Sequence, residues 1–217
     1  NILNQRFNQL KKIPMSILEN FCSKVSNNIK KNEKIFFDVG NFILNNFILH
    51  SKFSNAKYFI SDVEFYISSP THNIDVSEKT GKTVVHCTKR QLLNSEFYIH
   101  RVGSTFALIQ GAGIDLCFGN NNDIYAGILI REIINIETGE KFHGPQKVLR
   151  TLLNLPLFYG EYKQTYIERS QMAEAKNIYN PENQLYLEKL KNPNDFQVIP
   201  DLRVNVPNKL LYRIKKI

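Results

Sequence analysis

The spacing of hydrophobic residues along the chain predicts both helices and strands. Helical periodicity predicts helices over residues 16–31, with Ser16 as the N-cap, and over 38–50. Apolar runs with strand character come in the order 56–67, 96–102, 105–110, 114–118 and 124–136. The closing elements expected are a helix from Gly144-Pro145 to about Leu153, a charged helical segment over 169–191, and strands over 196–204 and 210–214. This order favours an α+β fold, a single domain over 1–217 with a curved antiparallel β-sheet core flanked by helices.

Two polar tracts separate the predicted strands. Residues 68–82 predict a long surface loop, and residues 119–123 predict a turn between two strands. Loops of that length often carry functional residues, so the first tract is a candidate for part of a site.

One carboxylate interrupts the first apolar strand. Side chains alternate along a strand, so Glu64 and Tyr66 are expected on one face, with Val63 and Phe65 on the other. A buried glutamate is costly unless a partner or a reaction uses it. Glu64 therefore marks either an edge strand with its carboxylate in solvent or a functional site.

Charge and cysteine content narrow the class of protein. The net charge is +8, which suits a nucleic-acid partner because Lys and Arg neutralise phosphates. The pairs Lys11-Lys12, Lys30-Lys31 and Lys215-Lys216 lie toward the two ends, and each taken alone is interpreted most simply as solvated surface charge. Three widely spaced cysteines (Cys22, Cys87 and Cys117) favour reduced thiols inside a cell, either in a bacterial cytoplasm or in a nucleus.

Several classes of protein are not favoured by the chain. Cysteine and histidine lack metal-ligand spacing, so no metal and no cofactor are expected. No run has the length of a membrane span and no signal-peptide order is present, so neither secretion nor a membrane partner is expected. Gly111-Ala112-Gly113 precedes a predicted strand instead of opening a helix, which argues against a dinucleotide loop.

Short motifs follow one another in a recognisable order. They are Glu64-Phe65-Tyr66, His86, Phe97-Tyr98-Ile99-His100, Ile114-Asp115-Leu116, Ile128-Leu129-Ile130-Arg131 and Gly144-Pro145-Gln146-Lys147-Val148-Leu149. This order resembles the 3-methyladenine (alkyladenine) DNA glycosylase family. Residues 203–206 and 212–214 look like the closing hairpin of that family, so the resemblance runs from about residue 15 to the C-terminus.

The resemblance implies a monomeric, monofunctional enzyme acting on double-stranded DNA. It would flip an altered base and hydrolyse the N-glycosidic bond with a glutamate-activated water. Glu64 matches the catalytic glutamate of the family, where a carboxylate can offset the cationic sugar and deprotonate the water. Arg131 matches the arginine that helps hold the water and the glutamate. The alternative for Arg131 is a simple ion pair or a solvated strand end.

Further residues match the base-binding positions of the family. Tyr66 matches the first stacking tyrosine, and His100 stands where the family has a second one. His86 matches the pocket histidine, although His72 competes for that role. Asp115 stands where the family has an asparagine that screens bases by their amino groups, so the preferred base should differ. Ordinary sheet packing remains the alternative for each ring.

The DNA-contacting positions match less closely. The family carries a tyrosine-bearing hairpin that wedges into the minor groove. The corresponding segment here, residues 101–111, is longer and lacks that tyrosine. Arg101 and Phe106 are both candidates for the wedge. The helix start near residue 144, flanked by Lys141 and Lys147, suits a DNA phosphate, and a plain helix N-terminus explains it equally well.

The leading hypothesis is thus a glycosylase for an altered base, with damaged alkylpurines as the default substrate. A specialised role, such as excision of a modified base from foreign DNA, is also compatible with the changed pocket residues. The alternatives are a non-catalytic nucleic-acid-binding protein that retains the fold and an unrelated α+β interaction module.

Overall fold

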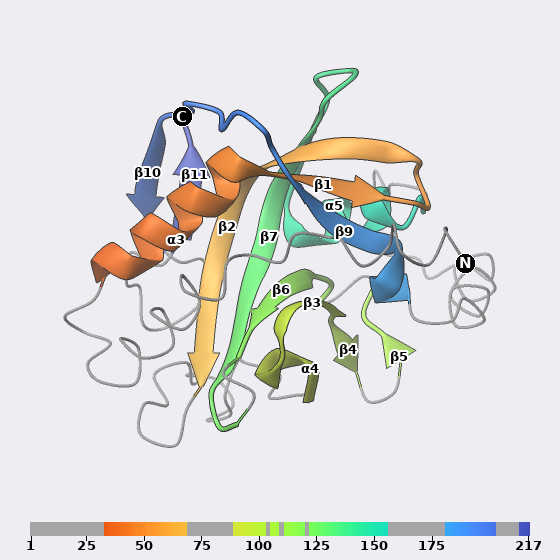
Figure 1. The fold of residues 1–217 in the computed structure, drawn as a ribbon. Coiled ribbons are helices and arrows are strands. Elements are labelled where there is room, and N and C mark those ends of the chain that lie inside the picture. The colour runs from red at the N-terminus through yellow and green to blue at the C-terminus, as the bar shows by residue number, and fades with distance from the viewer. Residues whose placement is uncertain are drawn as a thin grey trace, which may run out of the picture.

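The computed structural model describes residues 33–68, 89–102, 105–108, 111–119, 122–155, 181–202 and 213–217 (Figure 1). In chain order the elements are α3 (Glu33–Asn46), β1 (Phe47–Ser51), β2 (Ala56–Ser68), α4 (Lys89–Leu92), β3 (Asn94–Ile99), β4 (Arg101–Val102), β5 (Thr105–Phe106), β6 (Ile114–Phe118), β7 (Tyr125–Asn135), β8 (Lys141–His143), α5 (Pro145–Leu152), the 3₁₀ turn η2 (Pro181–Gln184), β9 (Leu185–Lys189), β10 (Val198–Asp201) and β11 (Arg213–Lys216). The predicted helix 16–31, most of the polar loop 68–82 and the motif 203–206 lie outside the described residues.

A curled antiparallel sheet forms the centre of the fold. Its strands follow the order β10-β11-β2-β7-β6-β3. In addition, β1 pairs with β2, β9 pairs with β1, and β8 pairs with β7. Strands β4 and β5 pair with each other in a separate small hairpin. Figure 1 shows β2 and β7 running side by side through the length of the sheet. The predicted α+β class with a curved antiparallel sheet is confirmed.

The two faces of β2 have different environments. Phe65 points toward α3, where its ring meets that of Phe36 edge-on at a centroid distance of 5.2 Å. Alternation along the strand places the buried Val63 and Ile67 on the same face. Figure 1 shows α3 across the near side of β2, β11 and β10, with α5 behind β7. The face that carries Glu64 is therefore turned away from α3.

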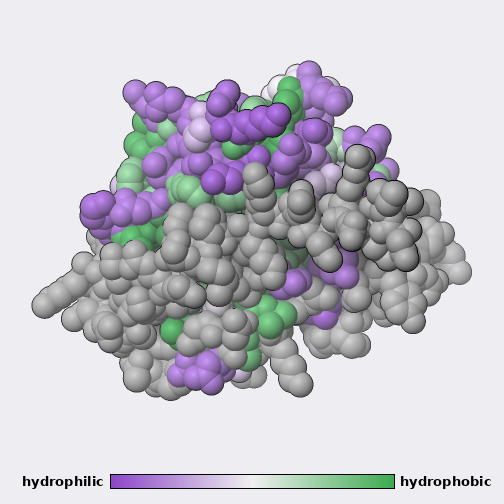
Figure 2. Space-filling model, in the orientation of Figure 1, coloured by the Kyte–Doolittle hydropathy of each residue, from purple (hydrophilic) through white to green (hydrophobic). Residues whose placement is uncertain are grey.

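Helix α3 presents a polar outer side and an apolar inner side. Lys34 and Asp38 lie exposed and form an i, i+4 ion pair, with Nζ 2.9 Å from Oδ2. Hydrophilic residues predominate over the upper part of the face that Figure 2 shows. The buried residues of α3 join one hydrophobic core with β2, β7 and α5. Amphipathic packing of this kind holds the helix against the sheet.

Close approach of α3 to β11 depends on a glycine. A Cβ at Gly40 would lie 2.6 Å from Cγ1 of the fully buried Ile214. We expect Gly40→Ala to lower the free energy of unfolding by about 1–3 kcal/mol, because forced displacement in a packed core outweighs the better helix propensity of alanine. Urea denaturation measures the change. An alanine variant as stable as the wild type would show that the helix can move away from Ile214 without cost.

Two predicted elements are wrong in part. The helix expected over 38–50 ends at Asn46, and Phe47–Ser51 form β1 between β2 and β9. The helical segment expected over 169–191 contains strand β9 at Leu185–Lys189. Pairing between segments far apart in sequence overrides local preference in both places, since β1 gains ladder hydrogen bonds on both edges. Residues 169–180 lie outside the described part.

Other boundaries agree closely with the predicted ones. Strand β6 covers the predicted residues 114–118, and β2 exceeds the predicted range 56–67 by one residue. Helix α5 begins at Pro145, as predicted from the Gly-Pro pair. The strand predicted over 105–110 is limited to Thr105–Phe106 in the described residues. Over the same described ranges, we find no helix with the length and apolar character needed to span a bilayer.

Candidate functional site

Glu64 lies in the interior of the sheet. It is opposite Leu129 of β7 on one side and Arg213 of β11 on the other. Its side chain is fully buried, with 0% of the residue exposed. Because β2 is hydrogen-bonded along both edges here, the interpretation that placed Glu64 in solvent on an edge strand is wrong. A carboxylate in this position requires partners.

Two side chains from the same face supply those partners. The hydroxyl of Tyr66 donates a hydrogen bond to Oε1 of Glu64 at 2.6 Å, and Nη1 of Arg131 donates to Oε2 at 2.8 Å. The predicted sharing of one face by Glu64 and Tyr66 is therefore confirmed. Burial, followed by the nearby charge of Glu64, raises the pKa of Tyr66. The phenol consequently stays protonated and acts as the donor.

A distortion in strand pairing directs Arg131 toward Glu64. The register of β2 against β7 shifts on both sides of Asp62, so that Asp62 is opposite Glu132 while Val63 is opposite Ile130. Arg131, between those two β7 residues, has no directly opposite partner in this register. Irregularities of this kind bend a strand and re-aim its side chains. The bulge thus helps place a guanidinium beside the buried carboxylate.

One N–H group of Arg131 has no acceptor among the described residues. Its side chain is only 12% exposed, and its Nε is buried without a hydrogen-bond partner among the described residues. Buried donors in native proteins nearly always have an acceptor, including ordered water or a ligand. The arrangement can therefore hold an acceptor atom next to Glu64, such as a water oxygen.

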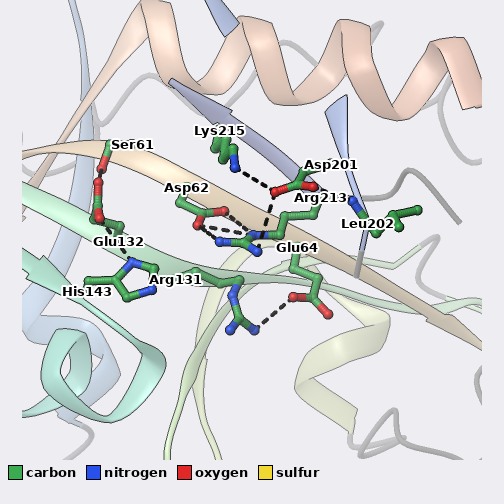
Figure 3. A network of polar contacts seen from close by, with 10 residues as sticks. All are labelled: Ser61, Asp62, Glu64, Arg131, Glu132, His143, Asp201, Leu202, Arg213 and Lys215. Atoms are coloured by element: carbon green, nitrogen blue, oxygen red, sulfur yellow. Dashed lines mark hydrogen bonds and ion pairs between the residues drawn. The ribbon is translucent and has the colours of Figure 1, made fainter. Parts of the chain in front are cut away.

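A second arginine adds positive charge near Glu64. Arg213 binds both carboxylate oxygens of Asp62, with Nε 3.0 Å from Oδ1 and Nη2 2.5 Å from Oδ2. Asp201 lies between Arg213 and Lys215, whose Nζ is 2.7 Å from Oδ2 (Figure 3). The hydrogen bond from Asp62 raises the pKa of Arg213 despite partial burial, and the charge of Glu64 contributes in the same direction. Arg213 therefore remains cationic beside the site.

A separate polar group lies farther along β7. Glu132 accepts a hydrogen bond from the hydroxyl of Ser61 at 2.8 Å and contacts Nδ1 of His143 at 3.0 Å (Figure 3). His143 lies at the end of β8, next to the start of α5, and is largely exposed. This group reaches the molecular surface at His143, and Glu132 follows Arg131 directly in sequence.

Asp115 shares the Glu64 face from two strands away. It is opposite Leu129, which is itself opposite Glu64, and Tyr98 of β3 is opposite Asp115. Directly opposite residues of antiparallel strands point to the same side. Burial and then the charge of Asp115 raise the pKa of Tyr98 to about 12. The structure therefore brings the predicted residues Glu64, Tyr66 and Asp115 onto one face.

His100 contacts Asp115 directly. Nε2 of His100 lies 2.9 Å from Oδ1 of Asp115, and Nδ1 lies 3.2 Å from the carbonyl oxygen of Gly111. Gln91 donates from Nε2 to the other Asp115 oxygen at 3.0 Å. Burial lowers the pKa of His100, but the charge and hydrogen bond of Asp115 outweigh it, so that the net shift is upward.

The two candidate wedge residues contact each other across the β4–β5 hairpin. Arg101 is opposite Phe106, and its guanidinium carbon lies 4.7 Å from the centroid of the Phe106 ring. Nη2 of Arg101 also donates to Oε1 of the buried Glu182 at 2.7 Å. Arg101 is thus held by a carboxylate and two rings, the second being that of Tyr98 at 5.9 Å.

The predicted phosphate-binding lysines are both exposed. Lys141 lies on β8 and Lys147 on α5, with the helix start at Gly144 between them in sequence. The backbone N–H of Gly144 donates to the carbonyl of Arg131 at 2.7 Å, and Gly144 has a φ of 97°, which favours glycine. The helix start is therefore anchored to the strand that carries the candidate catalytic arginine.

One of the lysine pairs behaves differently from a solvated surface pair. Nζ of Lys216 lies 3.3 Å from the centroid of the Phe196 ring and 4.8 Å from that of Phe59. Burial lowers the pKa of Lys216 to about 8. The interpretation of this residue as solvated charge is wrong, since its ammonium packs on aromatic faces.

The structure does not describe every residue named from the sequence. His86 and its competitor His72 lie outside the described residues, as do Cys22 and Cys87. Cys117 is buried in β6. Within the described ranges, no group of three or more His, Cys, Asp or Glu side chains is arranged to hold a metal ion.

Sequence reasoning missed most of the supporting polar residues. They are Asp62, Gln91, Glu132, His143, Glu182 and Asp201. Asp62 carried a usable signal, because a second carboxylate in the same apolar strand also needs a partner. The others gain their roles from contacts between elements far apart in the chain.

Comparison with known proteins adds one distant relative. No protein-family model matches the chain. The chain is similar to "Uncharacterized protein L759" of Acanthamoeba polyphaga mimivirus, with 25% identity over 193 residues, which cover 83% of this chain and 82% of that protein. The similarity thus extends along most of both chains, to a viral protein whose name assigns no activity.

Proposed function

We propose that this chain is a monomeric, intracellular, monofunctional DNA glycosylase of the 3-methyladenine (alkyladenine) DNA glycosylase type. It flips an altered base from double-stranded DNA and hydrolyses its N-glycosidic bond. The observation that carries the proposal is the fully buried carboxylate of Glu64 held between Tyr66 and Arg131. An anion in that position is costly, and a reaction through a cationic sugar makes use of it.

The residues can be assigned to the steps of hydrolysis. The departing base takes the electron pair of the N-glycosidic bond, which leaves an oxocarbenium-like sugar. The negative charge of Glu64 stabilises that sugar, and Glu64 accepts a proton from the water that adds to the anomeric carbon. The released base gains a proton in exchange, so the overall reaction consumes one water. Arg131 orients Glu64 and, through its unpaired Nε, can hold the water.

Base capture is assigned to the same face of the sheet. Tyr66 and His100 would enclose the flipped base, with Asp115 beside them. Because the hydroxyl of Tyr66 binds Glu64, the ring that stacks on the base also fixes the catalytic carboxylate. The hydrogen bond from Tyr66 to Glu64 would therefore connect base capture with hydrolysis.

The second candidate is a nucleic-acid-binding protein that has the fold without the activity. It is favoured by the hydrogen bonds that both oxygens of Glu64 already make within the protein. A carboxylate so engaged also serves as a structural ion pair. The two candidates differ in one measurable property, the release of free base.

A substrate panel tests the proposal. Purified protein is incubated with duplexes carrying alkylated, deaminated or hypermodified bases, and free base is quantified by mass spectrometry. The glycosylase proposal expects release from at least one class above a protein-free control. Absence of release from every duplex would favour the binding protein.

Binding to DNA is expected to be strongly salt-dependent. The +8 charge predicts micromolar or tighter affinity for duplex DNA at about 50 mM salt. Lys141 and Lys147 are the proposed phosphate contacts, because both are exposed and they lie on either side of the start of α5 in sequence. Replacing either lysine by glutamine should reduce the slope of log affinity against log salt by about one.

Lys34 provides the matched control for the salt experiment. It is exposed on α3, which covers the face opposite Glu64, and it pairs with Asp38. Lys34→Gln should leave the slope unchanged. An equal reduction in all three variants would show that DNA binding is diffuse, and salt-insensitive binding would remove the nucleic-acid proposals.

A further inference from the structure

His100 and Asp115 occupy space that two glycines leave open. A Cβ at Gly113 would lie 2.8 Å from Cε1 and Nδ1 of the His100 ring. A Cβ at Gly127 would lie 2.7 Å from Oδ2 of Asp115. Any larger residue at either position would displace the ring or the carboxylate. The sheet is therefore shaped to hold this pair on the Glu64 face.

Hydrogen-bond partners define the charge of the His100 ring. One ring nitrogen faces a carboxylate oxygen of Asp115 and the other faces the carbonyl oxygen of Gly111. An ionised carboxylate and a carbonyl oxygen can only accept, so with Asp115 ionised both contacts are satisfied only when each ring nitrogen carries a hydrogen. A doubly protonated imidazole is a cation. The upward shift of the His100 pKa, which Asp115 causes against the effect of burial, agrees with this assignment.

Asp115 serves mainly to hold the ring. Its Oδ1 contacts His100, and its Oδ2 accepts from Gln91, which is 1% exposed. With a donor on each oxygen, the carboxylate is fixed in orientation on both sides. Asp115 and Gln91 are thus positioning residues for His100. The negative charge lies at the edge of the ring, so it only partly offsets the positive charge that the ring face presents.

We infer that the base pocket selects an uncharged altered base over a cationic N-alkylated purine, because the wall formed by His100 is an imidazolium ring. This inference rests on the proposed function, under which the base lies between Tyr66 and His100. A cation over the face of a neutral π-system is attracted to it, whereas two stacked cations repel each other. The neutral ring of Tyr66 stacks favourably on either a cationic or an uncharged base, so the charge of His100 decides which base binds more tightly.

The charge of His100 is tested first, without any DNA. Protein labelled with ¹⁵N-histidine is observed by NMR at pH 7, and the His100 signals are assigned from their loss in His100→Gln. Two protonated ring nitrogens are expected in the wild type, and one in Asp115→Asn, in which the negative charge is lost while the shape is kept. A single protonated nitrogen in the wild type would overturn the inference.

The selectivity is tested with two bases that differ only in charge. One duplex carries 7-methylguanine opposite cytosine, and the other carries its uncharged isostere 7-deaza-7-methylguanine at the same position. Equilibrium binding is measured with Glu64→Gln to prevent cleavage of the first duplex. We expect about tenfold tighter binding of the uncharged base. His100→Tyr in the same background should abolish or reverse that preference, and His100→Gln should abolish it if the tyrosine variant does not fold.

The outcomes separate this inference from the proposed function. Equal affinity for both duplexes would overturn the inference, even if the wild type releases base from the substrate panel. A preference for the uncharged base that His100→Tyr removes would support the inference, even if no base is released. In that second case the protein would be a selective binder and the hydrolytic proposal would fail.

Discussion

Replacing Arg131 by methionine is expected to lower the free energy of unfolding by about 3–5 kcal/mol. Glu64 is fully buried, and Arg131 supplies its direct cationic partner at 2.8 Å. Methionine fills a similar volume but, among the described residues, leaves the carboxylate facing the neutral hydroxyl of Tyr66 and the more distant charge of Arg213. Urea denaturation followed by circular dichroism measures the loss.

The double variant Arg131→Met/Glu64→Gln provides the control. Removing the negative charge together with the positive one should recover a large part of the lost stability, because no unpaired charge is left in the interior. Additive losses in the two single variants would contradict the ion pair as the source of the effect. A wild-type-like Arg131→Met would show that solvent or another cation reaches Glu64.

Local patterns predicted those parts of the fold that depend on alternation and turn chemistry. The alternation along residues 56–67 placed Glu64 and Tyr66 on one face, as the 2.6 Å hydrogen bond between them confirms. Gly144 and Pro145 identified the start of α5. Strand β1 was missed because Phe47–Ser51 continue the apolar pattern of α3. Only pairing with β2 and with the distant β9 makes these residues a strand.

The sequence identified five candidate site residues but few of the residues that hold them in place. Glu64, Tyr66, Arg131, His100 and Asp115 were named from motif order, and the structure brings them onto one side of the sheet. The bidentate contact between Asp62 and Arg213 joins residues 151 positions apart, which no local pattern can indicate. The bulge that re-aims Arg131 depends likewise on the pairing of two strands.

Glu64→Gln is expected to reduce base release by at least about a hundredfold, the scale for loss of a positioned general base. Glutamine can keep both contacts, with its amide oxygen accepting from Arg131 and its amide N–H donating to the hydroxyl of Tyr66. It cannot take a proton from water or offset a cationic sugar. DNA affinity should be retained or rise, since a negative charge near the phosphates is removed.

The most direct test of the central claim is single-turnover base release by the wild type and Glu64→Gln, both saturated with the same duplex. The duplex is one from which the wild type releases base in the panel. The proposal predicts rapid release by the wild type and release slower by at least about a hundredfold in the variant, with equal DNA occupancy. Equal rates in the two proteins would contradict Glu64 as the catalytic carboxylate, and no release by either from any duplex in the panel would contradict the glycosylase itself.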